Sequence, residues 1–160
     1  MTRALSRAFA LTVLALTMLA CGGAADKSSK AEPAPVPAPL KDLTSMLPPD
    51  GRIAGRVVPD HILDQAKMPG GTLGDYESKG KKYQLFVIDA DTNQQAAFLL
   101  LDLKGALHGP EYISYMGGYF GSDGKQPVYA FAKLHYLAGV VGLSKDDADP
   151  IARVLAVRLR

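Results

Sequence analysis

The three histidines of this 160-residue chain are its first candidates for metal binding or for general acid–base chemistry. His61, His108 and His135 are far apart in the sequence, and the chain has neither an HExxH motif nor a pairing of histidine with cysteine. Zinc sites usually take their ligands at short, fixed spacings. The sequence therefore predicts no metal site and no cofactor, and it favours ordinary surface or partly buried histidines.

Nucleophilic and phosphate chemistry also lack a recognisable motif. No serine lies in a GxSxG elbow. The acidic residues at 89–91 and 146–149 lack the Asp-x-Asp-x-Asp-Gly spacing of a calcium loop. The glycine-rich segment 117–121 precedes an Asp-Gly turn and not a helix, whereas a phosphate loop needs a helix N-terminus directly after it. Catalysis is therefore the less favoured interpretation.

Tyrosine is the residue type whose distribution points to a binding surface. Five of the seven tyrosines fall between residues 112 and 136. A tyrosine side chain combines a broad contact area with a hydrogen-bonding hydroxyl, which suits binding surfaces. It is also an ordinary strand residue, so a plain sheet face of mixed polarity is the alternative.

Turn geometry predicts which of these side chains meet. If Asp123-Gly124 and Lys133-Leu134 are two-residue turns, paired residue numbers sum to 247 and then to 267. Tyr115, Ala132 and His135 then form one cross-strand row, with Tyr119 further along it. We predict that Tyr115, Tyr119 and His135 border a shallow notch with polar tips. The opposite face is expected to be the richer core, formed by Met116, Phe120, Tyr129, Phe131, Tyr136 and Val140.

Two helices and about five strands are expected to position these residues. The strands are predicted at Thr72–Glu77, Tyr83–Asp89, Tyr112–Phe120, Val128–Ala132 and His135–Leu143, with a hairpin turn at Ser78-Lys79-Gly80. Asp91 is expected to cap one helix and Asp149 the other, with Pro150 at the first helical position. The order β-β-α-β-β-β-α predicts an α+β domain with a mainly antiparallel sheet.

The first of these helices carries apolar residues at helical spacing. Ala96, Leu99, Leu100, Leu103 and Leu107 form the expected stripe. Because Phe98 and Leu101 widen the stripe, we expect this helix to be well buried.

Residues 1–20 have the three parts of an export signal. Arg3 and Arg7 form a positive start without acidic residues, and an apolar run from 8 to 20 follows. The run is too short to span a bilayer comfortably, since a transmembrane helix needs about 20 apolar residues. Without the signal, Lys+Arg falls from 18 to 16 against 16 Asp+Glu, so the mature chain is near neutral and no nucleic-acid partner is expected.

The segment Met18-Leu19-Ala20-Cys21-Gly22 resembles the lipobox of bacterial lipoproteins. That resemblance implies that Cys21 is acylated and becomes the mature N-terminus. Gly22, rather than aspartate, implies the outer membrane in a Gram-negative cell, facing the periplasm or the surface. An ordinary signal cut near Ala20 or Ala25, with a free Cys21, is the alternative.

Three regions are therefore expected: a signal peptide at 1–20, a lipidated tether at 21–45 and a single α+β domain at 46–160. The tether has no aromatic residue, and its alternating Pro33, Pro35, Pro37 and Pro39 favour an extended polyproline II stretch. Such a composition cannot offset its ordering entropy by burial, so we expect residues 22–45 to be a disordered stalk.

From about residue 71 to 158 the chain resembles an uncharacterised family of exported bacterial proteins without an assigned activity. The resemblance rests on Tyr83 with Val87-Ile88-Asp89, on Ala96-Ala97-Phe98, and on Val128-Tyr129-Ala130-Phe131 before Tyr136. Lys133-Leu134 departs from the Lys-Gly expected at that turn. The resemblance implies the order of elements and no mechanism.

The sequence thus predicts an envelope protein attached to a membrane by its N-terminal lipid, with a non-catalytic binding or interaction module of unidentified ligand. An envelope protein is a possible partner. Two alternatives stay open, an envelope enzyme with an unrecognised site and an accessory or assembly factor of a membrane complex. A deep polar pocket would favour the enzyme, and an exposed apolar patch would favour partner binding.

Overall fold

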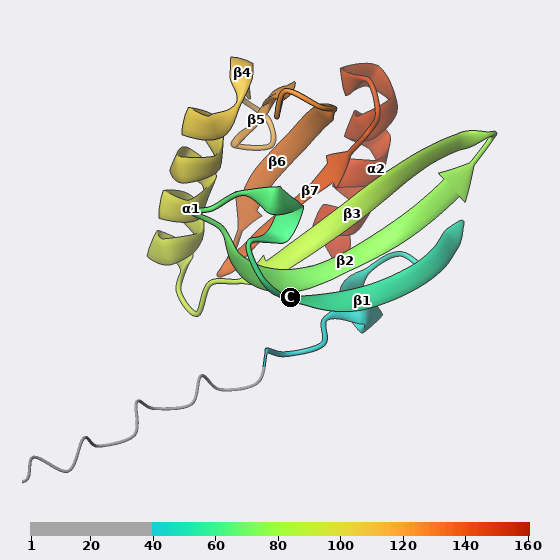
Figure 1. Ribbon diagram of the computed structural model, residues 1–160, viewed down its shortest axis with the longest axis horizontal. Coiled ribbons are helices and arrows are strands. Elements are labelled where there is room, and N and C mark those ends of the chain that lie inside the picture. The colour runs from blue at the N-terminus through green and yellow to red at the C-terminus, as the bar shows by residue number, and fades with distance from the viewer. Residues whose placement is uncertain (1–39) are drawn as a thin grey trace, which may run out of the picture. The chain divides into compact units, whose positions relative to one another are not determined.

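The protein is represented by a computed structural model that describes residues 40–160, and these residues form an α+β domain (Figure 1). One antiparallel sheet of seven strands has the order β1-β2-β3-β7-β6-β5-β4. The strands are β1 Arg52–Asp60, β2 Pro69–Ser78, β3 Lys81–Asp89, β4 His108–Ile113, β5 Gly118–Ser122, β6 Pro127–Lys133 and β7 Tyr136–Val141. The predicted α+β class with an antiparallel sheet is confirmed, although the sheet has seven strands and not about five.

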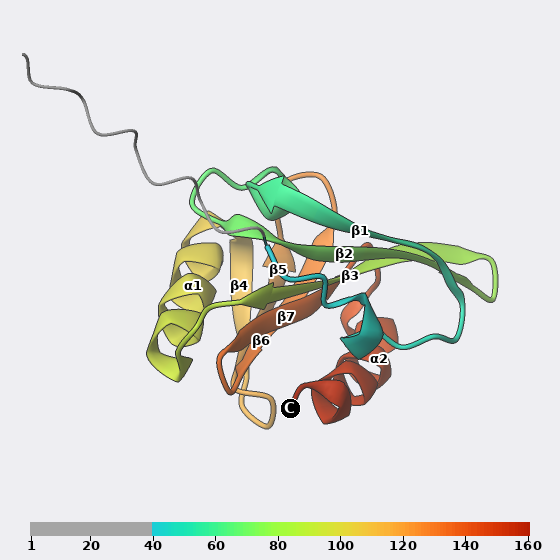
Figure 2. The same cartoon turned by 90° about the horizontal axis from the view of Figure 1, so that it is seen from below.

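The two main helices, α1 (Asn93–Ala106) and α2 (Lys145–Arg158), cover opposite faces of the sheet (Figures 1 and 2). Leu100 and Leu103 of α1 belong to one apolar cluster, and Ala152 and Leu155 of α2 belong to the other. Two short 3-10 turns, η1 (Thr44–Met46) and η2 (Ile62–Asp64), complete the described elements. Every central strand is therefore buried on both faces.

The edge strand β1 was not predicted because its sequence carries no burial pattern. All of its residues are exposed or half-exposed. Because neither face of the strand is buried, its sequence needs no alternation of apolar and polar residues, which is the pattern that predicts a strand. Arg52, Arg56 and Pro59 lie on it, and a register shift falls between Arg52 and Ala54. Charges, proline and bulges are features that discourage an edge strand from pairing with other chains.

The predicted strand Tyr112–Phe120 is wrong as a single strand. It is divided between β4 and β5 by a turn in which the Met116 N–H donates to the Ile113 carbonyl at 3.2 Å. Gly117 in this turn has φ +62, a conformation that glycine adopts at little cost. By contrast, the predicted hairpin turn is confirmed: Ser78 pairs with Lys81 across Lys79-Gly80.

The registers of β5, β6 and β7 differ from the predicted ones. Ser122 pairs with Pro127, so the β5–β6 loop has four residues, because the Asp123 carboxylate accepts bonds from two backbone N–H groups of that loop. Lys133 pairs with Tyr136, so Leu134-His135 forms the next turn, with Leu134 at φ 53. Each pairing sum rises by two, from 247 to 249 and from 267 to 269. Because a shift by two keeps the side chains of the paired strands on their faces, the predicted richer core face is confirmed.

Both helices begin at residues other than those predicted. Thr92, not Asp91, caps α1, and its side-chain oxygen accepts a hydrogen bond from the Gln95 N–H. Ser144, not Asp149, caps α2, and Pro150 lies inside the helix. Asp146 and Asp147 occupy the first turn of α2, where the helix dipole favours negative charge.

Residues 40–48, which we call the N-terminal strap, pack across the sheet beside α2. Leu43 and Leu47 are buried, and the Leu43 N–H donates to Thr72 Oγ1 at 2.9 Å. Gly74 leaves room for Leu47, because a Cβ there would lie 2.8 Å from its Cδ1. The packed region therefore begins before residue 46, the predicted boundary. Cys21, the predicted signal at 1–20 and most of the predicted tether lie outside the described residues.

Candidate functional site

The three residues predicted to border one notch lie in different places. Tyr115 is in the β4–β5 turn, where its hydroxyl donates to Asp149 Oδ1 at 2.7 Å and its ring lies 4.6 Å from the Arg153 guanidinium carbon. Tyr119 lies in β5 beside the apolar cluster of α1, and His135 lies in the β6–β7 turn. The predicted row is wrong because Tyr115 and His135 both fall outside the paired strands.

Tyr119 belongs to a small aromatic group beside α1. Its ring centroid lies 5.4 Å from that of Tyr112, which is 58% exposed. Lys104 of α1 places its Nζ 4.9 Å from the Tyr119 centroid, within the range of a cation–π contact. Of the three predicted residues, Tyr119 is the one that contacts α1, through Lys104.

His135 lies beside an ion pair, Lys41–Asp89, that links the N-terminal strap to the sheet. Its Nε2 is 3.9 Å from Asp89 Oδ1, while Lys41 Nζ bonds Asp89 Oδ2 at 2.8 Å. Burial alone would raise the pKa of the Asp89 carboxyl, but hydrogen bonds from Lys41 and the Asp91 N–H outweigh it and lower this pKa. Asp89 therefore stays charged and holds Lys41, which is a structural role.

Asp149 is the centre of a hydrogen-bonded group that the sequence did not predict. The sequence predicted that Asp149 caps a helix, and it gave no sign of these partners. Its Oδ1 accepts from the hydroxyls of Tyr115 and Tyr129, and its Oδ2 accepts from Arg153 Nε at 2.8 Å. Burial and the bond to Asp149 raise the pKa of the Tyr129 hydroxyl, so Tyr129 acts as a neutral donor. These side chains hydrogen-bond to one another, which indicates a structural role in holding α2 against the sheet.

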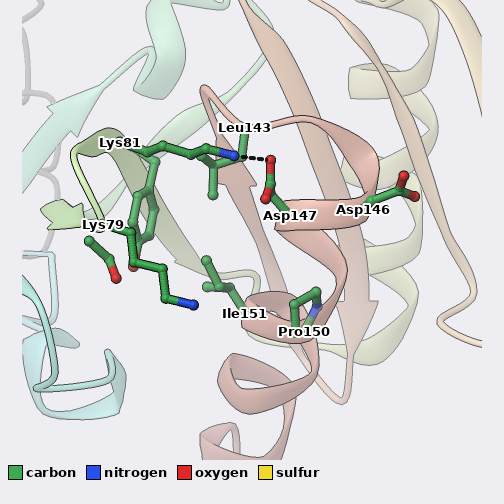
Figure 3. Close-up of a pocket in the computed structure, with 9 residues that line it drawn as sticks. Lys79, Lys81, Leu143, Asp146, Asp147, Pro150 and Ile151 are labelled. Atoms are coloured by element: carbon green, nitrogen blue, oxygen red, sulfur yellow. Dashed lines mark hydrogen bonds and ion pairs between the residues drawn. The ribbon is translucent and has the colours of Figure 1, made fainter.

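A groove separates the β2–β3 hairpin from the first turns of α2 (Figure 3). Lys81 Nζ reaches across it to Asp147 Oδ2 at 2.6 Å, and Lys79 extends toward Pro150 and Ile151. This part of the groove has a volume of about 280 Å³. A cavity of that size lies at the lower end of the range for small-molecule sites, about 300–1,000 Å³.

The groove continues along α2 into a second hollow of about 330 Å³. The two hollows share Ser78, Tyr83, Pro150 and Ile151. Tyr83 stacks on Tyr76 with a centroid distance of 5.2 Å. The residues that line the groove include one serine and no histidine, so they form a surface that can bind a ligand but supply no serine–histidine pair.

A more polar hollow of about 350 Å³ lies between η2 and the β5–β6 loop. Two of its cations are paired: Arg56 bonds Asp75, and Lys125 Nζ lies 3.1 Å from Asp64 Oδ2. The Asp123 carboxylate accepts backbone hydrogen bonds and forms no ion pair within the described residues. His61, Leu63 and Asp64 have left-handed φ values of 50, 61 and 56. Left-handed non-glycine residues often cluster at functional sites, so this hollow is the place that best suits the enzyme alternative.

The outward surface of α1 is apolar, contrary to the expected burial of that helix. Phe98 is 56% exposed and Leu101 is 52% exposed. The buried stripe runs through Ala96, Leu100 and Leu103, on the opposite side of the helix. The exposed side carries five uncharged residues, which we call the outer face of α1: Gln94, Ala97, Phe98, Leu101 and Gly105.

Hollows flank the outer face of α1 on its η2 side. One lies beside Phe98 and Pro69, and the other lies between Leu101 and the loop around Lys67. Asp102, a charged residue next to Leu101, forms an ion pair with Lys67, with 4.0 Å between Asp102 Oδ1 and Lys67 Nζ. The surface is therefore contoured and largely uncharged, as expected of a contact with another macromolecule.

Within residues 40–160 no three His, Cys, Asp or Glu side chains lie close enough together to hold a metal ion. Neither helix of this region is long and apolar enough to cross a membrane. No protein-family model, curated protein or solved structure matches the chain. The resemblance to exported bacterial proteins therefore stays a prediction.

Proposed function

We propose that this chain is a lipid-anchored protein of the bacterial envelope whose domain binds another macromolecule through the outer face of α1. The observation that carries the proposal is the exposure of Phe98 and Leu101 side by side on one helix. Full burial of such a side chain contributes about 1.5–3 kcal/mol, so a partner that covers both would gain stabilisation from burying them. Contiguous exposed apolar surface supports an interaction site, whereas single exposed apolar residues are normal.

The anchor part of the proposal rests on the sequence. The positive start, the short apolar run and Ala20-Cys21 together support export and acylation of Cys21. Two or more acyl chains give durable attachment, since each buried methylene contributes about 0.8 kcal/mol. The segment between Cys21 and the strap then serves as the tether. The accessory-factor alternative differs only in what the partner belongs to.

The enzyme alternative has one observation in its favour, the left-handed residues beside the polar hollow at η2. We favour the binding function, because Arg56 and Lys125 of that hollow are paired with carboxylates while Phe98 and Leu101 are more than half exposed.

Photo-crosslinking tests the binding function directly. A photoreactive phenylalanine analogue at position 98 should give a discrete adduct in intact membranes. The same analogue at Val157, which is 70% exposed on α2, is the matched control. Adducts of equal yield at both positions, or at neither, would contradict the proposal.

A further inference from the structure

The groove between the β2–β3 hairpin and α2 is lined mainly by apolar side chains along both of its hollows. Tyr83 and Ile151 line both hollows, Leu143 adds to the first, and Leu85 and Val154 add to the second. A continuous apolar track therefore runs along α2, which suits a flexible apolar chain. The groove lies on the face of the sheet that α2 covers, opposite to α1 (Figures 1 and 2), so what it binds is independent of the partner proposed for α1.

Three hydrogen-bond donors gather where the two hollows meet. Ser78 and Tyr83 line both hollows, and Lys79 lines the first. Within residues 40–160 none of these three side chains has a hydrogen-bond partner, and none is a buried unsatisfied group, so each is free to bond a ligand. Burial raises the pKa of the Tyr83 hydroxyl, so this group stays neutral and donates. The junction of the hollows therefore suits a ligand that carries hydrogen-bond acceptors.

Lys79 is the cation of this groove that has no carboxylate partner within the described residues. The other cation, Lys81, is paired across the groove, with 2.6 Å between its Nζ and Asp147 Oδ2. Figure 3 shows the Lys79 side chain extended toward α2 and the Asp146 side chain directed away from both lysines. Asp50 lines the second hollow and not the first. An anionic group is therefore favoured in the first hollow, beside Lys79, and disfavoured in the second.

Lys79 also has a backbone conformation that lysine rarely adopts. Its φ is 51 and that of Gly80 is 75, so both residues of the hairpin turn are left-handed. Two-residue turns of this kind favour asparagine, aspartate or glycine, because these residues tolerate positive φ. A left-handed lysine costs conformational energy, and such residues cluster at functional sites. The turn itself does not favour lysine at position 79, which supports a role for its ammonium group.

We propose that this groove binds a long-chain fatty acid. The carboxylate lies at Ser78, Lys79 and Tyr83, and the alkyl chain follows Ile151 and Val154 along α2. One unpaired ammonium matches the single negative charge of a carboxylate, whereas a phosphate monoester carries about 1.5–2 negative charges at neutral pH. Burial of each methylene adds to the affinity, so binding strengthens with chain length. This inference goes beyond the proposed function and does not rest on it.

A palmitic acid analogue that carries a photoreactive diazirine and an alkyne tests the proposal in native membranes that contain the full chain. After irradiation, mass spectrometry should place the adduct on peptides that contain Tyr83, Ile151 or Val154. Excess palmitate should lower the adduct yield about tenfold or more, whereas octanoate and hexadecyltrimethylammonium should compete poorly, because one is short and the other is cationic. Adducts that map elsewhere, or stronger competition by lysophosphatidic acid than by palmitate, would overturn the proposal.

Substitutions on the hairpin separate loss of the site from loss of the fold. Lys79→Asn should lower the adduct yield about tenfold or more, because it removes a charge-assisted hydrogen bond. It should leave the urea unfolding midpoint unchanged or raised, because asparagine tolerates positive φ. Tyr83→Phe keeps the ring and should lower the yield about threefold or more through loss of one hydrogen bond. Lys82→Asn, at an exposed lysine of the same hairpin that lines neither hollow, is the matched control and should keep the full yield. Undiminished adduct in either Lys79→Asn or Tyr83→Phe would overturn the proposal.

Discussion

The hydroxyl of Tyr129 donates a 2.9 Å hydrogen bond to Oδ1 of Asp149 and so joins the centre of the sheet to α2. Tyr129 is fully buried, and its partner carboxylate is 22% exposed. Burial alone would raise the pKa of the Asp149 carboxyl, but hydrogen bonds from Tyr115, Arg153 and Tyr129 outweigh it and lower this pKa.

Asp149→Asn is therefore expected to destabilise the domain at neutral pH, by about 1–3 kcal/mol. Because the folded-state pKa is lowered, the contribution of Asp149 is present above its unfolded pKa, about 3.9, and is lost as pH falls through the folded value. Urea unfolding of both proteins between pH 7 and pH 2 should show the difference shrinking below about pH 4. Asp50→Asn controls for the loss of one exposed charge. A difference that stays constant with pH would contradict the assignment.

Substitution of two glycines by alanine should have opposite effects on stability, because one lies in a crowded strand and the other in open space on a helix. A Cβ at Gly139 of β7 would overlap the backbone oxygen of Tyr129 and the ring of Phe86. Gly139→Ala should therefore destabilise by about 1–3 kcal/mol or more, since neither strand can move away easily. Gly105→Ala, in open space on α1, should stabilise by up to about 1 kcal/mol. Chemical denaturation of the dilute protein measures both, and equal effects would contradict the packing.

The strap is expected to behave as part of the fold. Leu47 is fully buried, so Leu47→Ala should cost about 2–5 kcal/mol in thermal or urea unfolding. Leu40→Ala, at a position that is 42% exposed, is the matched control and should change stability little. Limited proteolysis should leave a resistant fragment that starts before Leu43. A fragment starting after Met46, with the stability of the longer protein, would show that the strap does not contribute.

If Cys21 is lipidated, replacing its sulfur with oxygen in Cys21→Ser should prevent lipid attachment. In Cys21→Ser the sulfur that would carry the lipid is replaced by oxygen, so the precursor should stay unprocessed or leave the membrane fraction. Mass spectrometry of the N-terminal peptide and fractionation of cells measure both outcomes. Normal maturation and membrane attachment of the variant would contradict the role proposed for Cys21.

The parts of the fold that could be predicted are those with strong local signals. Lys79-Gly80 lies between two strand-like runs, and the structure has a hairpin there. Assignment to sheet faces also succeeded for residues of the paired strands, because face depends only on the parity of the pairing sum and both sums changed by two.

The remaining features depend on tertiary context. β1 is exposed on both faces and owes its strand conformation to pairing with β2, which no local pattern reports. The predicted notch is wrong because Tyr115 lies in the β4–β5 turn and His135 in the β6–β7 turn, outside the paired strands. The exposure of Phe98 was also not predictable, because α1 carries large apolar residues on both its buried and its exposed side and its sequence does not show which of them face the sheet.

The rate of thiol labelling at position 98 tests most directly whether the outer face of α1 is covered in the envelope. Cys21 is the chain's one cysteine, so Phe98→Cys and the control Val157→Cys each add a single thiol to the described region. Labelling with a maleimide is followed in native membranes and in dilute purified protein. The proposal predicts that Cys at position 98 reacts at least tenfold more slowly in membranes, while Cys at position 157 reacts equally in both. Equal rates for position 98 in the two preparations would contradict a bound partner at this face.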